Sequence, residues 1–266
     1  MLTLKLKNIE GEIISEHSHH QETYLALKEY GYQLGDYIEL TVENVPAFLW
    51  VQVDEALAPS LIYLTEKIWK YEIIIDETLK RAFSPKIFSG SRHYITVKMA
   101  TAQDIEGYRN LALNSHDQKE WSGAFPHAYA NVETRNDSTF FARNAIDGMI
   151  ANENHGSFPY QSWGINQQKD AQITVDFGRE VRIDKIALVL RGDYPHDSYW
   201  TQMTIAFTTG EEITIYPTKK LDRQFFHFKE IETRSIMLKK LIKHEDESPF
   251  PALTQVEVFG WEIADN

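Results

Sequence analysis

The sequence predicts an all-β protein made of two consecutive β-sandwich domains. Short stretches in which apolar and polar residues alternate recur along most of the chain, and turns rich in Gly, Pro and Asn separate them. Strand patterns are not interleaved with helical patterns, which disfavours a parallel doubly wound sheet. A chain of 266 residues is long for one β-domain and long enough for two domains that each bury a core.

The first half contains about six predicted strands, enough for a sandwich or small barrel. Residues 2–7, LTLKLK, alternate with period two, and residues 36–43 and 47–53 form a predicted hairpin across the turn Asn44-Val45-Pro46. Residues 20–31 have two interpretations, a short helix ending at Gly31 or a loop. The remaining strands of this half are predicted at 60–64, 67–75 and 92–99.

A short helix is predicted to link the halves at residues 101–109, because Thr101 can cap it and Asp104 follows. The composition then changes, since residues 110–141 are polar with few periodic apolar positions. We therefore place one domain at residues 1–108 and the other at 109–266. Strands of the second domain are predicted around 173–177, 183–190, 203–207, 213–215, 226–228, 236–238 and 256–258.

Composition excludes several classes of protein. The net charge of −12 argues against nucleic acid as a partner and disfavours an anionic membrane surface. The chain has no cysteine, so disulfides and thiol chemistry are excluded. Its first residues, MLTLKLKNIEGEIISE, lack the apolar core of a signal peptide, and no apolar run has transmembrane length. The expected location is the cytoplasm.

The stretch from Leu190 to Trp200 is the densest in groups that recognise ligands. It follows an apolar strand and contains a Gly-Asp-Tyr-Pro turn. If the strand 203–207 extends backwards, Tyr199 faces inward and Trp200 faces outward with the polar positions of that strand. Indoles stack on the C–H faces of sugars, while charged and amide groups bond sugar hydroxyls. The predicted ligand-binding residues here are Arg191, Asp193, Tyr194, His196 and Trp200.

Three further residues are predicted to contribute to the same site. Trp163 is either a second stacking platform or a buried core residue, and His127 and His155 are placed on adjacent loops. An aromatic residue precedes proline four times between strands, and these rigid corners either plug the ends of the sandwich or contact ligand. They are Phe125-Pro126, Phe158-Pro159, Tyr194-Pro195 and Phe250-Pro251.

The acidic residues do not establish an enzyme. Glycosidases use two carboxylates at a defined separation, and an i, i+4 pair in a loop, such as Asp193 and Asp197, fixes none. Residues 245–247, Glu-Asp-Glu, are interpreted as a solvated turn. No catalytic residue is assigned, and absence of catalysis is favoured. A histidine cluster near the N-terminus, His17, His19 and His20, is predicted to be a surface feature without metal.

Three stretches in the second half carry a resemblance to a known family. Residues 142–148, ARNAIDG, are similar to an A-x-N-A-x-D-G motif, and residues 173–186 resemble its I-x-V-D-L-G strand pair. Residues 253–260, LTQVEVFG, are similar to a closing A-E-I-E-V-Y-G strand. Over about residues 110–262 the chain resembles galactose-binding-like jelly rolls, the group of discoidin or coagulation factor 5/8 C-terminal domains and related carbohydrate-binding modules. Residues 1–100 resemble a generic β-sandwich accessory domain.

The resemblance implies an antiparallel jelly roll that binds ligands through loops at one end. It also implies a structural calcium ion near Asp147, although Gln255 stands where the family usually has a glutamate. The favoured hypothesis is a non-enzymatic carbohydrate-binding protein. Two alternatives stay open: a glycan-active enzyme or enzyme subunit with its site between the domains, and a protein-interaction module.

Overall fold

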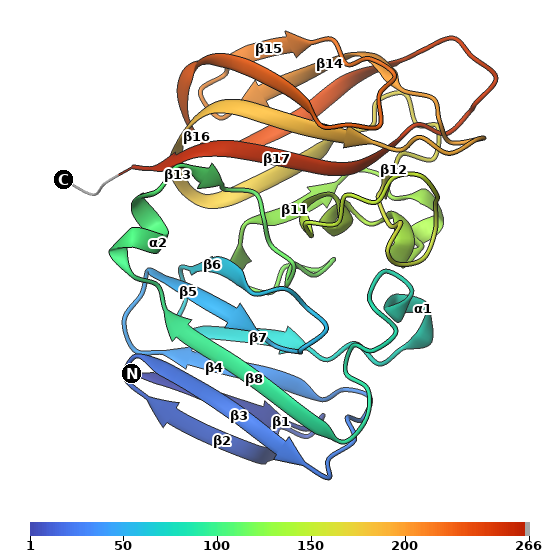
Figure 1. Cartoon of the computed structure of the whole chain (residues 1–266). Coiled ribbons are helices and arrows are strands. Elements are labelled where there is room, and N and C mark those ends of the chain that lie inside the picture. The colour runs from blue at the N-terminus through green and yellow to red at the C-terminus, as the bar shows by residue number, and fades with distance from the viewer. Residues whose placement is uncertain (264–266) are drawn as a thin grey trace.

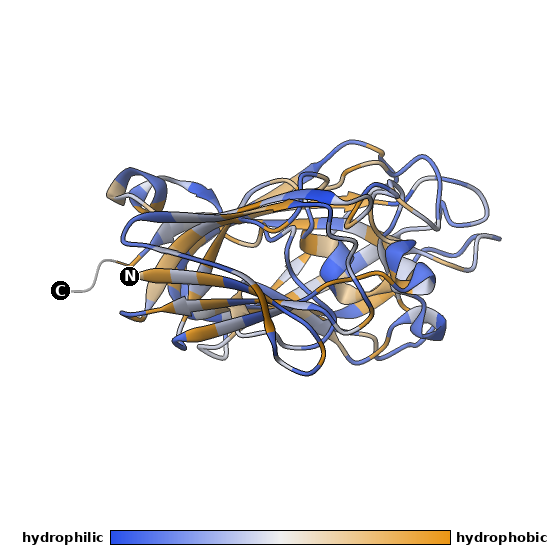
Figure 2. Cartoon of the chain, turned by 90° about the horizontal axis from the view of Figure 1, so that it is seen from below, coloured by the Kyte–Doolittle hydropathy of each residue, from blue (hydrophilic) through white to orange (hydrophobic). Residues whose placement is uncertain are grey.

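The computed structural model describes residues 1–263 as a nearly all-β protein with its two halves stacked on each other (Figure 1). Hydrophobic residues concentrate in the strands, whereas most connecting loops are hydrophilic (Figure 2). Within these residues, no helix has the length and apolarity that crossing a membrane requires. The predicted all-β class is confirmed.

The first half is a sandwich of two antiparallel sheets. One has the order β2-β1-β4-β7 and the other the order β10-β6-β5-β8-β3. Strict alternation of buried and partly buried residues, as in β1, turns one face of each sheet to a shared core. The strands are β1 (Leu2–Lys7), β2 (Ile13–His19), β3 (Glu22–Lys28), β4 (Tyr37–Val42), β5 (Ala47–Gln52), β6 (Ser60–Leu64), β7 (Ile68–Glu72), β8 (Arg92–Met99) and β10 (Ala124–Phe125).

Two predictions for this half were wrong. Residues 22–28 form strand β3, not a helix or loop, because Thr23 and Leu25 alternate inward with period two. Strands β4 and β5 are not a hairpin, since they lie in different sheets. The turn between them carries the chain from one layer of the sandwich to the other, which a sequence pattern cannot distinguish from a hairpin turn.

The predicted helical link between the halves is confirmed. Helix α2 (Ala102–Glu106) begins with a capping box, in which Thr101 accepts from the Asp104 amide and the Asp104 side chain accepts from the Thr101 amide. A second short helix, α1 (Glu77–Lys80), is capped by Asp76 and was not predicted.

The second half is built on two long, bent strands. β13 (Ile173–Leu190) joins two stretches predicted as separate strands, and β16 (Gln224–Lys243) joins two more. An irregularity in the β13–β16 register between Asp176 and Val181 coincides with Gly178, whose φ of +73° favours glycine. The other elements are β9 (Arg109–Asn110), β11 (His127–Ala130), β12 (Trp163–Gly164), β14 (Trp200–Phe207), β15 (Glu212–Ile215) and β17 (Ala252–Glu262), with 3₁₀ turns at Thr134–Asn136, Ser138–Phe140 and Ala142–Ile146.

The strands of this half join in the order β12-β17-β13-β16-β14-β15, with β11 beside β13 and β9 beside β17. The β14–β15 hairpin is confirmed, with Met203 opposite Ile215. The core of this half draws its residues from 111–258, whereas the core of the first half uses residues 2–97 and Ala124. The exact boundary at residue 108 stays a prediction.

Buried polar residues join the two halves. The amide of Val53 donates to Nε2 of His116 at 3.2 Å, and the hydroxyls of Ser60 and Ser115 lie 2.8 Å apart. Burial lowers the pKa of His116 to about 3, with the positive charge of Arg143 acting in the same direction. A neutral, bonded histidine therefore sits in the junction between the halves.

Candidate functional site

The loop between β13 and β14 lies at one end of the second half and is fixed at its base. The amide of Gly192 donates to the carbonyl of Asn152 at 2.9 Å. The Asn152 side chain donates to the carbonyls of Leu190 and Leu221 at 2.7 and 2.8 Å. These bonds hold residues 191–199 against the loop that contains His155.

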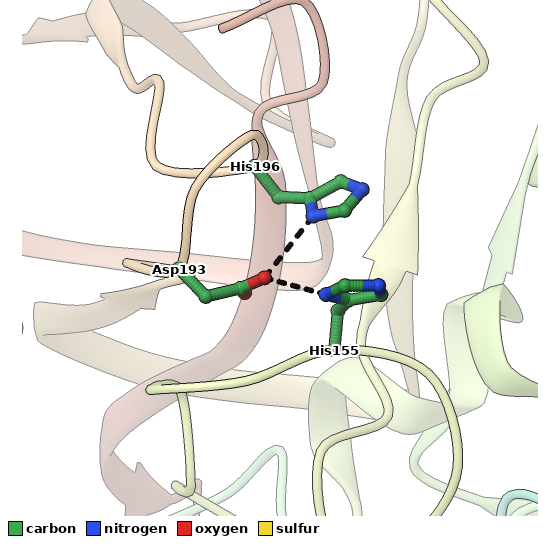
Figure 3. A group of neighbouring side chains, drawn as sticks. All are labelled: His155, Asp193 and His196. Atoms are coloured by element: carbon green, nitrogen blue, oxygen red, sulfur yellow. Dashed lines mark hydrogen bonds and ion pairs between the residues drawn. The ribbon is translucent and has the colours of Figure 1, made fainter.

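Asp193 is the centre of the cluster that results (Figure 3). Its Oδ2 accepts from Nδ1 of His155 at 2.5 Å and lies 3.1 Å from Nδ1 of His196. The two imidazole rings are 4.0 Å apart between centroids. One carboxylate thus orients two histidines that come from different loops.

The shared carboxylate also selects a tautomer. A neutral imidazole that donates its Nδ1 proton keeps its lone pair on Nε2. Burial lowers the pKa of His196 from its ordinary value, more than the hydrogen bond to Asp193 raises it, so His196 is neutral at pH 7. Nε2 of His196 is therefore a hydrogen-bond acceptor.

Arg191 lies beneath this cluster and is almost fully buried. Its Nη2 donates to the hydroxyl of Ser162, and its guanidinium lies over the Phe140 ring at 5.5 Å. Nε of Arg191 is 3.8 Å from Oδ1 of Asp193. Across the described part of the chain, both of these atoms lack a hydrogen-bond partner. Burial lowers the pKa of Arg191 to about 10, so it still carries its charge at pH 7.

A small pocket of about 80 Å³ adjoins the cluster. Arg191 and His196 form part of its wall, and the ring of Phe250, 41% exposed, lies 5.8 Å from the His196 ring. The pocket therefore combines a buried cation, an imidazole and an accessible aromatic ring. The other residues around it are Thr134, Arg135, Phe140, Gly164, Ile165, Asn166, Gln167, Pro251 and Ala252.

Strained backbone lies on two sides of this pocket. Arg135 and Asn136 have φ of +55° and +51°, and Asn166 and Gln167 have +49° and +58°. Non-glycine residues rarely adopt this left-handed region, and such residues concentrate at binding sites. Sequence reasoning missed all four, because nothing in their local pattern indicates a positive φ.

The predicted outward orientation of Trp200 was wrong. Trp200 and Met203 are both fully buried in the core of the second half. The register of β14 against β16 shifts between Trp200 and Gln202 and again between Gln202 and Thr204. From Gln202 to Trp200 the partner moves by one residue only, from Ile242 to Lys243, so β14 has one extra residue there. Counting back by twos therefore gave the wrong side. Tyr199, predicted inward, is only partly buried and stacks on His244 at 4.8 Å.

Trp163 and His127 are also outside the cluster. Trp163 is fully buried, with its indole N–H donating to the carbonyl of Val132 at 2.9 Å, so the core interpretation holds. His127 lies on β11 opposite the first half of β13, and its Nδ1 is 2.8 Å from Asp117. The Asp193 loop follows the other end of β13, so His127 is not adjacent to it as predicted.

The aromatic-proline corners divide between the two interpretations. Phe125 is buried, and its strand pairs with β6 of the first half. Tyr194 is 73% exposed and Phe250 is 41% exposed. The structure thus places Arg191, Asp193, His155 and His196 together, with Tyr194 on the same loop and Phe250 beside it.

The residues around Asp147 do not fit the calcium ion that the family resemblance implies. Oδ1 of Asp147 accepts from the amide of Met149 and from Nε2 of Gln255, each at 2.8 Å. Its Oδ2 accepts from Nε2 of Gln161 at 2.7 Å. Nε2 of Gln255 also donates to the carbonyl of Asn144 at 2.6 Å. Calcium requires several oxygens that converge on the ion. Here the NH₂ group of Gln255 lies where those oxygens would converge.

Replacing that amide should create calcium dependence. In Gln255→Glu, a carboxylate would face Asp147 inside the protein, so we expect a loss of about 2–3 kcal/mol of stability in EDTA. Calcium should reverse much of the loss, because an ion at about 100 times its Kd adds about 2.7 kcal/mol. Thermal unfolding with and without calcium measures this. A wild-type chain stabilised by calcium would contradict the assignment.

Asp193 and Asp197 have different partners. Asp197 bonds Lys219 at 2.7 Å and the hydroxyl of Ser248. The hydrogen bonds from Lys219 and Ser248 lower the pKa of Asp197, which is the opposite of what a general acid needs.

No family model and no curated protein matches the chain. Among solved structures, similar chains include a chitosan-binding module of a chitosanase/glucanase from Paenibacillus sp. IK-5, 20% identical over 57% of this chain and 98% of that one, with a TM-score of 0.39. Another is the family 32 carbohydrate-binding module of C. perfringens NanJ in complex with galactose, 19% identical over 50% and 91%, with a TM-score of 0.38. A third is a fucose-binding module of Streptococcus pneumoniae, 13% identical over 57% and 98%, with a TM-score of 0.40. Each of the three is described as a module that binds a carbohydrate, and at such identities and TM-scores the likeness carries no argument about function.

Proposed function

We propose that the second half is a non-enzymatic carbohydrate-binding module and that its site is the Asp193 cluster with the adjoining pocket. The observation that carries the proposal is the convergence of Arg191, Asp193 and His196 beside an exposed phenyl ring. A sugar offers hydroxyl groups that both donate and accept, and C–H faces that pack on aromatic rings. Each of those features has a counterpart here.

Nε2 of His196 supplies an acceptor for a hydroxyl proton. With Nδ1 directed at Asp193, His155 and His196 present their Nε2 atoms away from the carboxylate (Figure 3). The carboxylate fixes both rings before the ligand arrives, so little side-chain entropy is lost on binding. Arg191, which borders the pocket, contributes the cationic donor.

Phe250 takes the stacking role that the sequence assigned to Trp200 or Trp163. Both indoles are buried, whereas the Phe250 ring is accessible beside the pocket. Packing a C–H face against it would place neighbouring hydroxyls near His196. Tyr194, on the tip of the loop, is positioned to extend the contact surface.

The size of the pocket favours a terminal sugar. Its volume of about 80 Å³ is well below the roughly 300–1,000 Å³ of pockets that enclose drug-sized ligands. One edge of a single ring can enter, and the rest of a glycan would extend into solvent. We therefore expect the site to recognise the terminal sugar of a glycan and not its internal sugars.

A glycan array followed by calorimetry tests the proposal. We expect saturable one-to-one binding to a glycan with a terminal sugar that fits the site, lost in His196→Ala. The control is His244→Ala, since His244 also pairs with an aspartate, Asp246, but lies outside the pocket. Absence of any saturable glycan, or equal affinity in His196→Ala, would refute the proposal.

The enzyme alternative requires a raised-pKa carboxyl in the site. Burial raises the pKa of Glu133 and of Asp147, but hydrogen bonds hold both carboxyls and neither borders the pocket. Chromogenic glycosides distinguish the two functions, because turnover that Asp193→Asn abolishes would favour the enzyme.

A further inference from the structure

Two imidazole nitrogens and a carboxylate oxygen converge at the tip of the second half. The candidate ligand atoms of His155, Asp193 and His196 all lie within 4.8 Å of one another. His155 comes from the loop after the 3₁₀ turns, and the other two from the β13–β14 loop, so the folded chain alone brings them together (Figure 3).

The donor set selects a class of ion. Imidazole nitrogens with one carboxylate oxygen suit zinc and related first-row divalent ions, whereas calcium and magnesium prefer oxygen alone. Ligation through Nδ1 requires that each imidazole carries its proton on Nε2 instead of on Nδ1.

We propose that Nδ1 of His155, Nδ1 of His196 and a carboxylate oxygen of Asp193 bind a divalent transition-metal ion of the zinc class. A fourth position stays open to water. The proposal depends on these three side chains and not on the carbohydrate function, since it concerns the binding of the ion alone.

The ligand atoms lie within 4.8 Å of one another, so binding an ion requires an adjustment of their positions. Zinc ligands lie about 2.0–2.2 Å from the ion, which in a tetrahedral site separates them by about 3.4 Å. The separations of 2.5 and 3.1 Å between Oδ2 of Asp193 and the two Nδ1 atoms must widen slightly. The His155 side chain is 41% exposed and lies on an irregular loop, so it has room to move. Oδ1 of Asp193, which lacks a hydrogen-bond partner within residues 1–263, is a further oxygen that can coordinate the ion.

Arg191 opposes the ion and so limits its affinity. Nε of Arg191 lies 3.8 Å from Oδ1 of Asp193, and a nearby positive charge repels a dication. The negative charge of Asp193 partly offsets this repulsion, because its carboxylate faces both Arg191 and the ion. The two imidazoles therefore provide most of the selectivity, and removal of either one is expected to be decisive.

Cobalt(II) absorption provides the test, because low-coordinate Co²⁺ has visible d–d bands that the hydrated ion largely lacks. Titration of the full chain with Co²⁺ should give these bands at one equivalent, and Zn²⁺ should displace them. His155→Ala and His196→Ala should each weaken Co²⁺ binding at least tenfold.

Two controls separate this site from other histidines. His244→Ala and the double variant His19→Ala, His20→Ala should leave the bands unchanged, because these side chains are exposed or half-buried and lie outside the cluster. Thermal unfolding confirms that each variant is folded. The proposal would be overturned if the bands persisted in folded His155→Ala and His196→Ala. It would also be overturned if the wild-type chain gave only the spectrum of hydrated Co²⁺.

Discussion

Trp200→Ala is expected to lower the free energy of unfolding of the second half by about 3–5 kcal/mol, as truncation of a large buried aromatic does. Trp200 is fully buried and shares its core with Met203 and Ile205, so alanine would leave a cavity. The sugar affinity of the protein that remains folded should not change. Urea unfolding followed by calorimetry below the transition measures both quantities.

Trp200→Phe is the matched variant. The indole N–H of Trp200 is buried without a hydrogen-bond partner within the described chain, and phenylalanine removes it while filling most of the volume. We expect a much smaller loss of stability than for alanine. If Trp200→Ala instead kept its stability and bound sugar tenfold more weakly, Trp200 would belong to the site after all.

Asp193→Ala is expected to weaken sugar binding at least about a hundredfold, or about 2.7 kcal/mol. The substitution removes the carboxylate that orients His155 and His196 and leaves the buried charge of Arg191 without its partner. Loss of a shared anchor affects several ligand contacts together, so the effect exceeds that of one hydrogen bond. Calorimetry with the best glycan measures the affinity.

Asp197→Ala is the control for this effect. Asp197 lies four residues away in the same loop, but it bonds Lys219 and Ser248 and not the histidines. Its removal should change affinity less than threefold. Equal losses in both variants would indicate that the loop, and not the Asp193 cluster, determines binding.

The strand pattern of this chain could be predicted because alternation marks strands directly. The residues 2–7 and 92–99 match β1 and β8 closely, and the capped link matches α2. What alternation does not encode is which sheet a strand joins, as with β4 and β5, or where a bulge shifts its phase. The position of Trp200 depended on one such shift in β14, between Trp200 and Gln202.

The site was predictable only in part. Arg191, Asp193 and His196 lie within six residues, so composition alone marked their loop. The contribution of His155 could be proposed but not located, because it depends on how a distant loop folds back. Arg135, Asn166 and Gln167 reach the pocket through left-handed backbone that no local signal indicated.

The calcium expectation shows how one residue can change a site. The motif containing Asp147 is present, yet Gln255 replaces the usual glutamate and donates to the very carboxylate that would bind the ion. The substitution was visible in the sequence. Its consequence, an amide in the position of a cation, depends on how the folded chain brings Gln255 to Asp147.

A crystal structure with the glycan that gives the strongest response tests the central claim most directly. We expect the terminal sugar to pack against Phe250, with hydroxyls within hydrogen-bond distance of Nε2 of His196 and of the Arg191 guanidinium. A sugar bound elsewhere, with the Asp193 cluster and its pocket unoccupied, would contradict the account.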